Sequence, residues 1–552
     1  MPDAHDTSSS TRTTWWSCLV VIAVCLTVGL QTVRRDNYFL GDDFGLVHHL
    51  HDLPAARLLT YFVSDWTEGA YGVVLDELRP VLASSYWLDA HLFGAANAAG
   101  YHATNVLLHI LNALLVLAIA RSIAPREPLF AVFAASFFAL MPSHAEPIAW
   151  ISGRVDSLAS LFYLGAFLCF VRFRLGHRRR WLLAALTVFA CGLFAKQSMV
   201  TLPVLIVAFD WLWFRPQDPG GRVASRVWPH IPFFVLAASY LALRHTLFGN
   251  AVREDQLTAD TIKAFMLRQD SYARELMPMP IWAPTAMRTA AAVLTVGILA
   301  ACAYWVFMQR RASGQVIRRV WLFGAVWYLV TIAPMIVTYL SARHLYITTA
   351  GLSIAVASLV LPAYPDEDRR RRKTRAAMAG TLLVLYAVAS IWDVSVWVTR
   401  GRDSQRFAAA IPRLLQTVPR GSLVFVDVPD RNRDGWFWAW STPFALGPPF
   451  TDQDLNAAFR IVERPEIYCC PADQWWGSRK ATVAALLDSS MPQEVTYITF
   501  AGDREPSFSR RTVDGRALKA RIDAVQEKPI DTSPAGAMPD EGALTRVLFE
   551  HP

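Results

Sequence analysis

Two adjacent carboxylates follow the first long apolar stretch of the chain, in the sequence Gly41-Asp42-Asp43-Phe44. A carboxylate in such a place can take a proton from a hydroxyl group, which accelerates a reaction by about 10²- to 10⁴-fold. It can also bind a divalent metal such as Mg²⁺ or Mn²⁺. The alternative is structural, because Asp43 could cap a helix that begins near Phe44. Asp42 and Asp43 are therefore the first candidates for a catalytic or metal site.

A second group of ionisable residues lies between two apolar segments and comprises His144, Glu146, Arg154 and Asp156. A charge deep in a bilayer costs about 2.5–3.5 kcal/mol on insertion scales. So many charges in one short segment predict a hydrated cavity. Arg154 and Asp156 could instead pair with each other or with nearby loops.

Two cations stand at the ends of later apolar segments, Lys196 and Arg343. Both side chains could neutralise a phosphate group. The alternative is that each extends along the membrane to reach water at the interface.

Polar residues also recur at helical spacing in one apolar segment, at His102, Asn105, His109 and Asn112. At about 100° per residue they fall on one face of a helix. This face could line a substrate cavity, with His102 as a binding residue, or form hydrogen bonds between helices.

The composition places these residues in a multi-span membrane protein. The chain has 552 residues, of which 54% are hydrophobic and 20 are Trp, and its mean hydropathy is +0.28. A soluble core could not hold so much apolar surface. The formal net charge is +8, and the basic residues form short clusters between apolar runs. Such clusters set the orientation of helices in a membrane, so we expect no nucleic-acid partner.

Apolar stretches long enough to cross about 30 Å of hydrocarbon predict about eleven transmembrane helices. They are 15–33, 103–121, 128–143, 156–172, 181–195, 199–214, 228–247, 289–308, 320–340, 345–363 and 376–398.

The cations occupy alternate loops, which the positive-inside rule makes cytoplasmic. These loops carry Arg121 and Arg126; Arg172, Arg174 and 178–180; Arg215, Arg222 and Arg226; Arg310, Arg311, Arg318 and Arg319; and 369–373 with Arg375. It follows that residues 1–14 are cytoplasmic and that the candidate site residues share the opposite face. The first span is a retained anchor, because 31–35 is a poor signal-peptide cleavage site.

The outer segments differ in character. The first outer loop, 34–102, has leucines at near-helical spacing from Leu46 to Leu59 and a second helix-like stretch at 80–93. We expect two interfacial helices that cover the bundle.

The tail, 399–552, predicts a small extracytoplasmic α/β domain. It should contain an amphipathic helix at 404–418 and strands at 423–428, 495–500 and 546–549. The cysteines show no disulfide framework and no zinc spacing. The vicinal pair Cys469-Cys470 is read as two small apolar residues or one reactive thiol.

Several of these segments together resemble a known family. They are Arg79-Pro80; 101–109, Tyr-His-Ala-Thr-Asn-Val-Leu-Leu-His; 144–156, His-Ala-Glu-Pro-Ile-Ala-Trp-Ile-Ser-Gly-Arg-Val-Asp; 196–203; and 343–346, Arg-His-Leu-Tyr. In order and position they are similar to the membrane half of the transmembrane and tetratricopeptide-repeat O-mannosyltransferases and to bacterial relatives in the GT-C superfamily. The resemblance covers about residues 15–365, and its most specific part is Ala-Trp-Ile-Ser-Gly-Arg.

This resemblance implies a GT-C-like helical membrane domain at 15–398 and a glycosyltransferase activity. The donor would be a sugar, such as mannose, on a polyprenyl phosphate. Asp42 and Asp43 match the first-loop acidic motif of the family, where one Asp would be the base of an inverting single displacement. Other motif positions are matched by Arg79, His144, Glu146, Arg154, Lys196 and Arg343, without individual roles.

The chain departs from the family pattern at Met141-Pro142, where relatives often have His-Pro, and at His344, which replaces an aromatic residue. The tail shows no tetratricopeptide repeat, so the acceptor could be a protein, a lipid-linked glycan or a cell-envelope polymer. Two other functions stay open, a translocase of lipid-linked sugars and an inactive scaffold with the same fold. We expect a bacterial inner membrane with a periplasmic active face.

Overall fold

The structure is a computed structural model. It describes residues 4–68, 75–125, 127–214, 227–251, 258–278, 284–308, 313–338, 341–361, 369–427, 431–432, 435–436, 438, 441–463, 484, 487, 492–500 and 506–524. Cys469-Cys470, the predicted strand 546–549 and several predicted loop arginines lie outside these residues.

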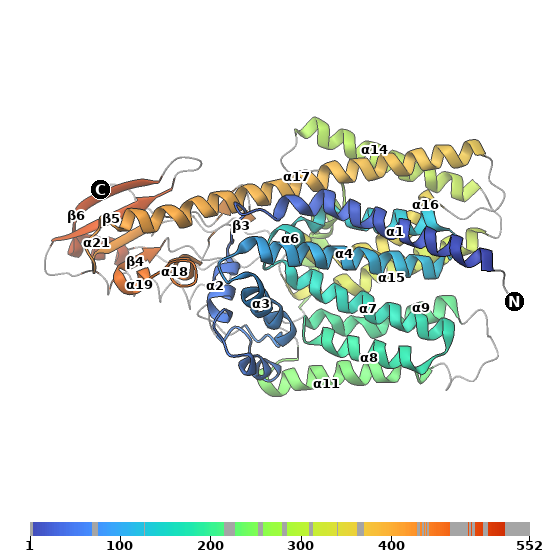
Figure 1. The fold of residues 1–552 in the computed structure, drawn as a ribbon, viewed down its shortest axis with the longest axis horizontal. Coiled ribbons are helices and arrows are strands. Elements are labelled where there is room, and N and C mark those ends of the chain that lie inside the picture. Colours follow the sequence, from blue (N-terminus) through green and yellow to red (C-terminus); the bar gives the residue numbers. More distant parts are fainter. Residues whose placement is uncertain are drawn as a thin grey trace.

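Each of the predicted spans contains a helix, and Figure 1 shows these helices aligned along the long axis of the molecule. They are α1 (Ala4–Gly29), α4 (Ala98–Ile123), α5 (Pro128–Ala139), α7 (Arg154–Gly176), α8 (Arg179–Leu193), α9 (Leu202–Trp213), α11 (Ile231–Phe248), α14 (Thr285–Met308), α15 (Ser313–Ile332), α16 (Thr348–Val360) and α17 (Arg369–Leu415).

Among the described residues, seven helices are long and apolar enough to cross a membrane. An eighth span results if α5 is joined with Pro142–Ala149, to which it is bent by 57°. The prediction of a polytopic helical membrane protein is confirmed. The full number of about eleven spans stays a prediction, since α8, α9 and α16 are short.

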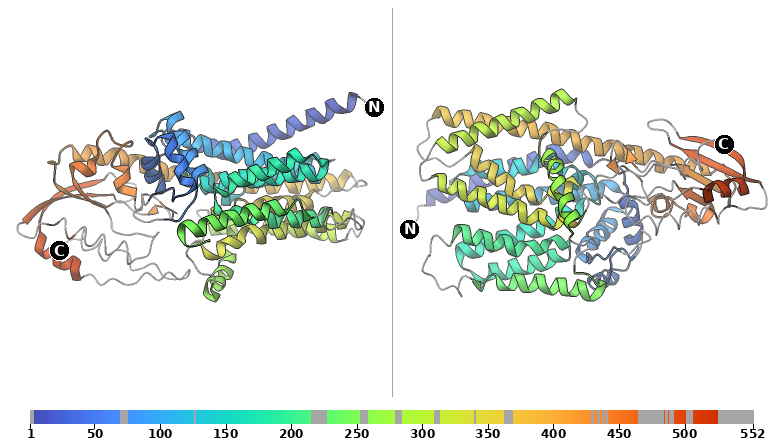
Figure 2. Two further views of the ribbon diagram at one scale, coloured as in Figure 1. Left: turned by 90° about the horizontal axis from the view of Figure 1, so that it is seen from below. Right: turned by 180° about the vertical axis from the view of Figure 1, so that it is seen from behind.

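Short elements connect the spans, and most of them lie at the end of the bundle that faces the tail (Figure 2). They are η1 (Leu30–Thr32), α2 (Asp42–Leu50), η2 (Ala55–Phe62), α3 (Pro80–Phe93), η3 (Pro142–His144), α6 (Ala145–Ala149), η4 (Gln197–Thr201), α12 (Ala259–Leu267), α13 (Gln269–Glu275), η6 (Ala333–Val337) and η7 (Ala342–Leu345). The two helices expected in the first outer loop are present as α2 and α3. The first ends at Leu50, and Leu58 and Leu59 of that pattern lie in η2.

The tail contains a four-stranded mixed sheet of order β4-β1-β5-β6, in which β1 runs parallel to β4 and β5, and β6 is antiparallel to β5. The strands are β1 (Leu423–Asp427), β4 (Arg460–Glu463), β5 (Pro492–Thr499) and β6 (Ser507–Asp514), with a separate pair β2 (Arg431–Asn432) and β3 (Gly435–Trp436). Short helices accompany them, α18 (Thr442–Ala445), α19 (Leu455–Ala458) and α21 (Gly515–Ala524). The strands predicted at 423–428 and 495–500 and the α/β character of the tail are confirmed.

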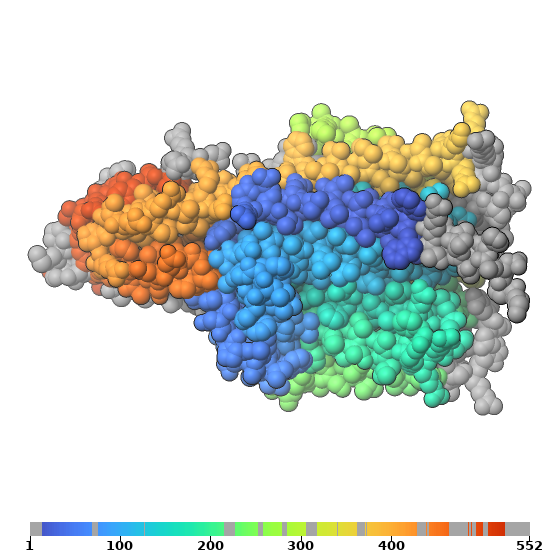
Figure 3. All heavy atoms as spheres, in the orientation of Figure 1, coloured from blue at the N-terminus to red at the C-terminus, as the bar shows by residue number. Residues whose placement is uncertain are grey.

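One boundary differs from the prediction. The helix expected at 404–418 is the continuation of α17, which runs without a break from the last span into the tail (Figure 1). The predicted division at residue 398 therefore falls inside a helix. Figure 3 shows the tail projecting from one end of the helical body, where it meets the blue first outer loop.

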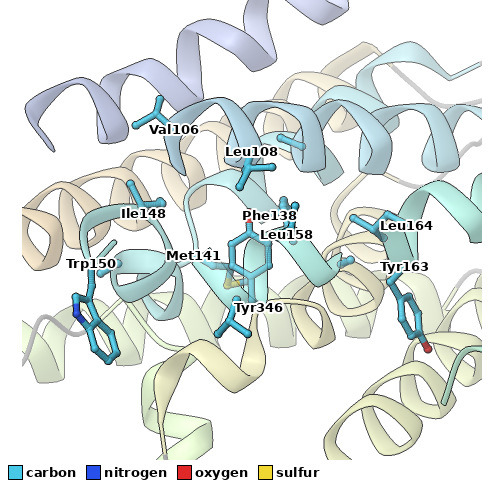
Figure 4. Packing of buried hydrophobic residues seen from close by; sticks show 14 of the residues in the cluster. Val106, Leu108, Phe138, Met141, Ile148, Trp150, Leu158, Tyr163, Leu164 and Tyr346 are labelled. Carbon is cyan, nitrogen blue, oxygen red and sulfur yellow. The ribbon is translucent and has the colours of Figure 1, made fainter. Parts of the chain in front are cut away.

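An aromatic cluster packs the centre of the bundle. Figure 4 shows Phe138, Met141 and Tyr346 side by side between helices. The Tyr346 hydroxyl lies 2.8 Å from His109 Nδ1, and His109 Nε2 lies 3.1 Å from the carbonyl oxygen of Ala139. These bonds satisfy polar atoms that would be costly to bury alone.

Close packing of α15 and α16 gives a test of the fold. A Cβ on Gly351 would lie 2.5 Å from the Trp327 ring, which is held by a bond from its Nε1 to the Ile347 carbonyl. We expect Gly351→Ala to lower the free energy of unfolding by about 1–3 kcal/mol. Gly380→Ala is the control, since a Cβ there meets nothing within 4 Å. Thermal unfolding in detergent measures both, and equal midpoints would contradict this packing.

Candidate functional site

Asp43 joins the first outer loop to the turn that precedes α7. Its Oδ1 accepts hydrogen bonds from the Ser152 N–H at 2.8 Å and the Ser152 hydroxyl at 2.5 Å, and its Oδ2 accepts one from the Leu40 N–H at 2.9 Å. The side chain is 1% exposed. The capping alternative is wrong, because Gly41 is the N-cap of α2 and Asp43 bonds a residue before the helix. Asp43 is thus a structural link within the candidate site.

The turn that receives Asp43 is held from both sides. The Trp150 indole N–H donates to the Leu40 carbonyl at 3.1 Å. A Cβ on Gly153 would lie 2.5 Å from the Glu146 carbonyl oxygen. Only glycine allows the backbone to come this close, which explains the glycine in the Ser-Gly-Arg part of the motif.

Asp42 is half-buried at the start of α2. Burial raises the pKa of Asp42 to about 6; the positive charge of Arg343 opposes the rise, and the negative charge of Glu77 adds to it. Burial also raises the pKa of Asp43 to about 7, although its hydrogen bonds with Ser152 and Leu40 oppose the rise. Such a carboxylate can exchange a proton near neutral pH.

A cationic cluster lies close to Asp42. Asp156 pairs with the Lys196 ammonium and lies 3.5 Å from Arg343 Nε. The Arg343 guanidinium lies over the Trp150 ring at 4.9 Å. Lys196 is 9% exposed, and burial lowers its pKa, with the charges of Arg343 and Arg79 adding to the decrease. The alternative that these two side chains extend to the membrane interface is wrong, since both pair with Asp156 inside the protein.

Arg79 joins the same region from the N-terminus of α3. Its Nη1 lies 2.8 Å from the Glu77 carboxylate, and its Nη2 donates to the Gln197 side chain at 3.3 Å. Glu77 also accepts a bond from the Trp66 indole N–H at 3.0 Å. Glu77 was not among the predicted site residues, and its only signal in the sequence was a lone carboxylate two residues before Arg79.

Arg154 is fully buried and serves an internal ion pair. Its Nη2 lies 2.5 Å from Asp89 Oδ2 and donates to the Tyr101 carbonyl at 2.9 Å, and its Nε donates to Asn105 Oδ1 at 2.8 Å. Its guanidinium lies over the Tyr86 ring at 4.8 Å. Arg154 does not pair with Asp156, but the alternative that it pairs with a nearby loop is confirmed, because Asp89 lies in the first outer loop. Asp89 was missed because it reads as an ordinary polar residue of a helix.

The polar face of α4 serves hydrogen bonding between helices. The Asn105 amide donates to the Trp150 carbonyl at 3.0 Å, and the Asn112 amide donates to the Ser157 carbonyl at 2.8 Å. His109 bonds α5 and Tyr346 as described above, and His102 is 1% exposed on the same helix. The hydrogen-bonding alternative is therefore confirmed for Asn105, His109 and Asn112, while a binding role for His102 stays a prediction.

His144 and Glu146 lie apart from the acidic pair. His144 Nε2 lies 2.8 Å from the Thr349 hydroxyl, and its ring centre is 4.2 Å from that of Tyr346. The Ser341 hydroxyl donates to Glu146 at 2.6 Å. A role in substrate binding stays a prediction for both residues.

Binding of a divalent metal by Asp42 or Asp43 stays a prediction. Among the described residues, no group of three or more His, Cys, Asp or Glu side chains could hold a metal ion. Both oxygens of Asp43 accept hydrogen bonds from protein donors. No step below depends on Mg²⁺ or Mn²⁺.

Comparison with known proteins gives partial matches. The chain is 31% identical over 147 residues to "Protein O-mannosyl-transferase Tmtc1" of Drosophila melanogaster, covering 27% of this chain and 16% of the relative. It is 26% identical over 236 residues to "Protein O-mannosyl-transferase TMTC4" of Homo sapiens, covering 38% and 31%. The predicted resemblance to these O-mannosyltransferases is confirmed. The aligned segments span less than a third of each relative's length, and no family model matches the chain.

Solved structures with a similar arrangement are also known. ArnT from Cupriavidus metallidurans bound to undecaprenyl phosphate has a TM-score of 0.48 at 12% identity, covering 88% of this chain and 93% of that one. Arabinofuranosyltransferase AftD from Mycobacteria has a TM-score of 0.46 at 14% identity, covering 88% and 35%. Both scores are below 0.5, and we draw no conclusion from them.

The Arg154–Asp89 pair gives a direct test of the architecture. Asp89→Ala leaves a buried guanidinium without its carboxylate, and we expect the free energy of unfolding to fall by about 3–5 kcal/mol. Asp270→Ala is the control, because it removes a carboxylate from an exposed pair with Arg274 and should change stability little. Thermal unfolding of the purified variants measures the difference. Similar midpoints for the two variants would contradict the role given to Arg154.

Proposed function

We propose that this protein is a membrane glycosyltransferase of the GT-C type. It transfers a sugar, with mannose as the first candidate, from a polyprenyl phosphate to an acceptor hydroxyl on the extracytoplasmic side. The observation that carries the proposal is the position of Asp42, a half-buried carboxylate with a raised pKa that is coupled in charge to Arg343. Arg343 is half-buried and shares Asp156 with the buried Lys196. The similarity to O-mannosyltransferases supports the same reaction class.

The two aspartates take different roles. Asp42 is the base, because Asp43 is engaged by three protein donors and Asp42 is coupled in charge to Arg343. In a single displacement, Asp42 takes the proton of the acceptor hydroxyl while that oxygen attacks the anomeric carbon. The bond from this carbon to the phosphate oxygen breaks, and the lipid phosphate leaves with the electron pair. Attack opposite the leaving group inverts the anomeric configuration.

The leaving phosphate gains negative charge, and the cations near Asp42 can stabilise it. Arg343 and Lys196 are the first candidates, because both pair with Asp156, whose single negative charge offsets only one of the two positive charges. Arg79 lies next to them through Gln197. Arg154 is assigned to positioning, since Asp89 and Asn105 occupy its guanidinium.

Three acceptor classes are included in the test of the proposed transfer: protein, lipid-linked glycan and cell-envelope polymer. The proposed setting is a bacterial inner membrane with this site in the periplasm. A translocase of lipid-linked sugars is the second candidate, and transfer of label to an acceptor distinguishes the two activities.

Substitution of each aspartate tests the assignment of the base. Membranes containing the chain receive radiolabelled sugars on a panel of polyprenyl phosphates. We expect Asp42→Asn to lower kcat/KM by about 10²-fold or more, because the base is lost, with little change in thermal stability. Asp43→Asn should lower activity and thermal stability together, because an amide oxygen with an added N–H donor cannot replace a carboxylate that accepts three bonds.

Equal abundance of the variants in the membrane is the control. Loss of activity confined to Asp43→Asn, with Asp42→Asn at the wild-type rate, would contradict the assignment. Movement of intact lipid-linked sugar across the bilayer without transfer would contradict the proposed function.

The pH dependence of transfer gives a further test. The base must be ionised, so kcat/KM should rise with pH and level off above a midpoint near 6, the pKa of Asp42. Glu77→Gln removes a negative charge that raises this pKa, and we expect the midpoint to move to lower pH. Arg343→Gln removes a positive charge that lowers it, and the midpoint should move to higher pH. Unchanged midpoints in both variants would exclude Asp42 as the titrating base.

A further inference from the structure

A segment of the tail packs directly on the acidic motif of the first outer loop. We name this segment the tail clamp and define it by Trp438, Ser441, Phe444 and Phe450. In Figures 1 and 3 the orange tail meets the blue first loop at this end of the bundle. The contacts join residues that are about 400 positions apart in sequence.

Hydrogen bonds tie the clamp to the backbone just before the acidic pair. The Ser441 hydroxyl donates to the carbonyl oxygen of Gly41, and both groups are buried. Two residues before Gly41, the Phe39 carbonyl accepts a hydrogen bond from the Ser404 hydroxyl of α17 at 2.6 Å. The Trp438 indole N–H donates in turn to Ser404 Oγ at 2.7 Å.

Aromatic packing holds the same loop from the side. The Phe44 ring centre lies 5.2 Å from that of Trp438 and 4.9 Å from that of Phe450. The Phe39 ring centre is 5.1 Å from that of Phe450. Phe39, Phe44 and Trp438 are fully buried, so this contact belongs to the core of the protein.

The geometry of Gly41 explains why these contacts matter. Gly41 has φ of +50° and ψ of −122°, and it places the chain at the start of α2. Its carbonyl belongs to the peptide that joins it to Asp42, so the Ser441 bond fixes the orientation of that peptide. Asp43 is fixed separately through Ser152, whereas the clamp acts on the peptide of Asp42.

We propose that the tail clamp positions Asp42, with Ser441 and Trp438 as positioning residues. This inference rests on the proposed function. The tail is then a part of the catalytic site, and its detachment from the loop would misplace the base. A misplacement of about 1 Å can lower a rate by ~10²-fold.

The test compares Ser441→Ala and Trp438→Phe, each of which removes one donor and keeps most of the packing. Ser507→Ala is the control, because the Ser507 hydroxyl contacts Thr499 on the exposed edge of the tail sheet. Two quantities are measured in the full chain. The first is kcat and KM for the lipid-linked sugar, and the second is amide hydrogen exchange of the peptide 38–47, which does not depend on activity.

We expect both clamp variants to lower kcat by about 10-fold or more, with KM for the donor within about twofold of wild type. Exchange in 38–47 should become faster, while Ser507→Ala should match the wild type in both measurements. Clamp variants that match the wild type in exchange and in kcat overturn the inference. If the wild type transfers no sugar, the proposed function fails, and hydrogen exchange alone then decides whether the clamp holds the loop.

Discussion

The buried carboxylate of Asp43 is the link on which the candidate site depends. A carboxylate removed from water requires donors of its own, and these come from the Ser152 backbone and hydroxyl and from the Leu40 backbone. These bonds draw the first outer loop onto the turn before α7. Asp42, the neighbour of Asp43, is coupled in charge to Arg343 of η7, which shares Asp156 with Lys196.

The charges at this end of the bundle are arranged in two layers. The deeper layer is the Arg154–Asp89 pair, which contacts Tyr86, Tyr101 and Asn105 and joins α3, α4 and α7. The outer layer contains Asp156 with Lys196 and Arg343, near Asp42. Pairing makes burial of these ions tolerable. A phosphate that entered the outer layer could share the cations with Asp156, whereas the deeper layer is already complete.

Apolar stretches and strand patterns predicted most elements of the fold, since hydropathy and alternation are local properties of the chain. The pattern of spans and basic loops also predicted that the candidate residues share one face of the membrane domain. It did not predict the partners of Arg154 or the contact of Ser441 with Gly41, because such pairs depend on helix rotation and on tertiary contacts. The continuity of α17 was missed because its composition becomes polar where the helix leaves the apolar region, while the backbone stays helical.

An experimental structure with a bound polyprenyl-phosphate sugar tests the central claim most directly. We expect the phosphate to lie against Lys196 and Arg343 and the anomeric carbon to face Asp42 with space for an acceptor hydroxyl. We also expect Asp43 to remain bonded to Ser152. A phosphate bound away from both cations, or an Asp43 that leaves Ser152 to face the sugar while Asp42 stays remote, would contradict it.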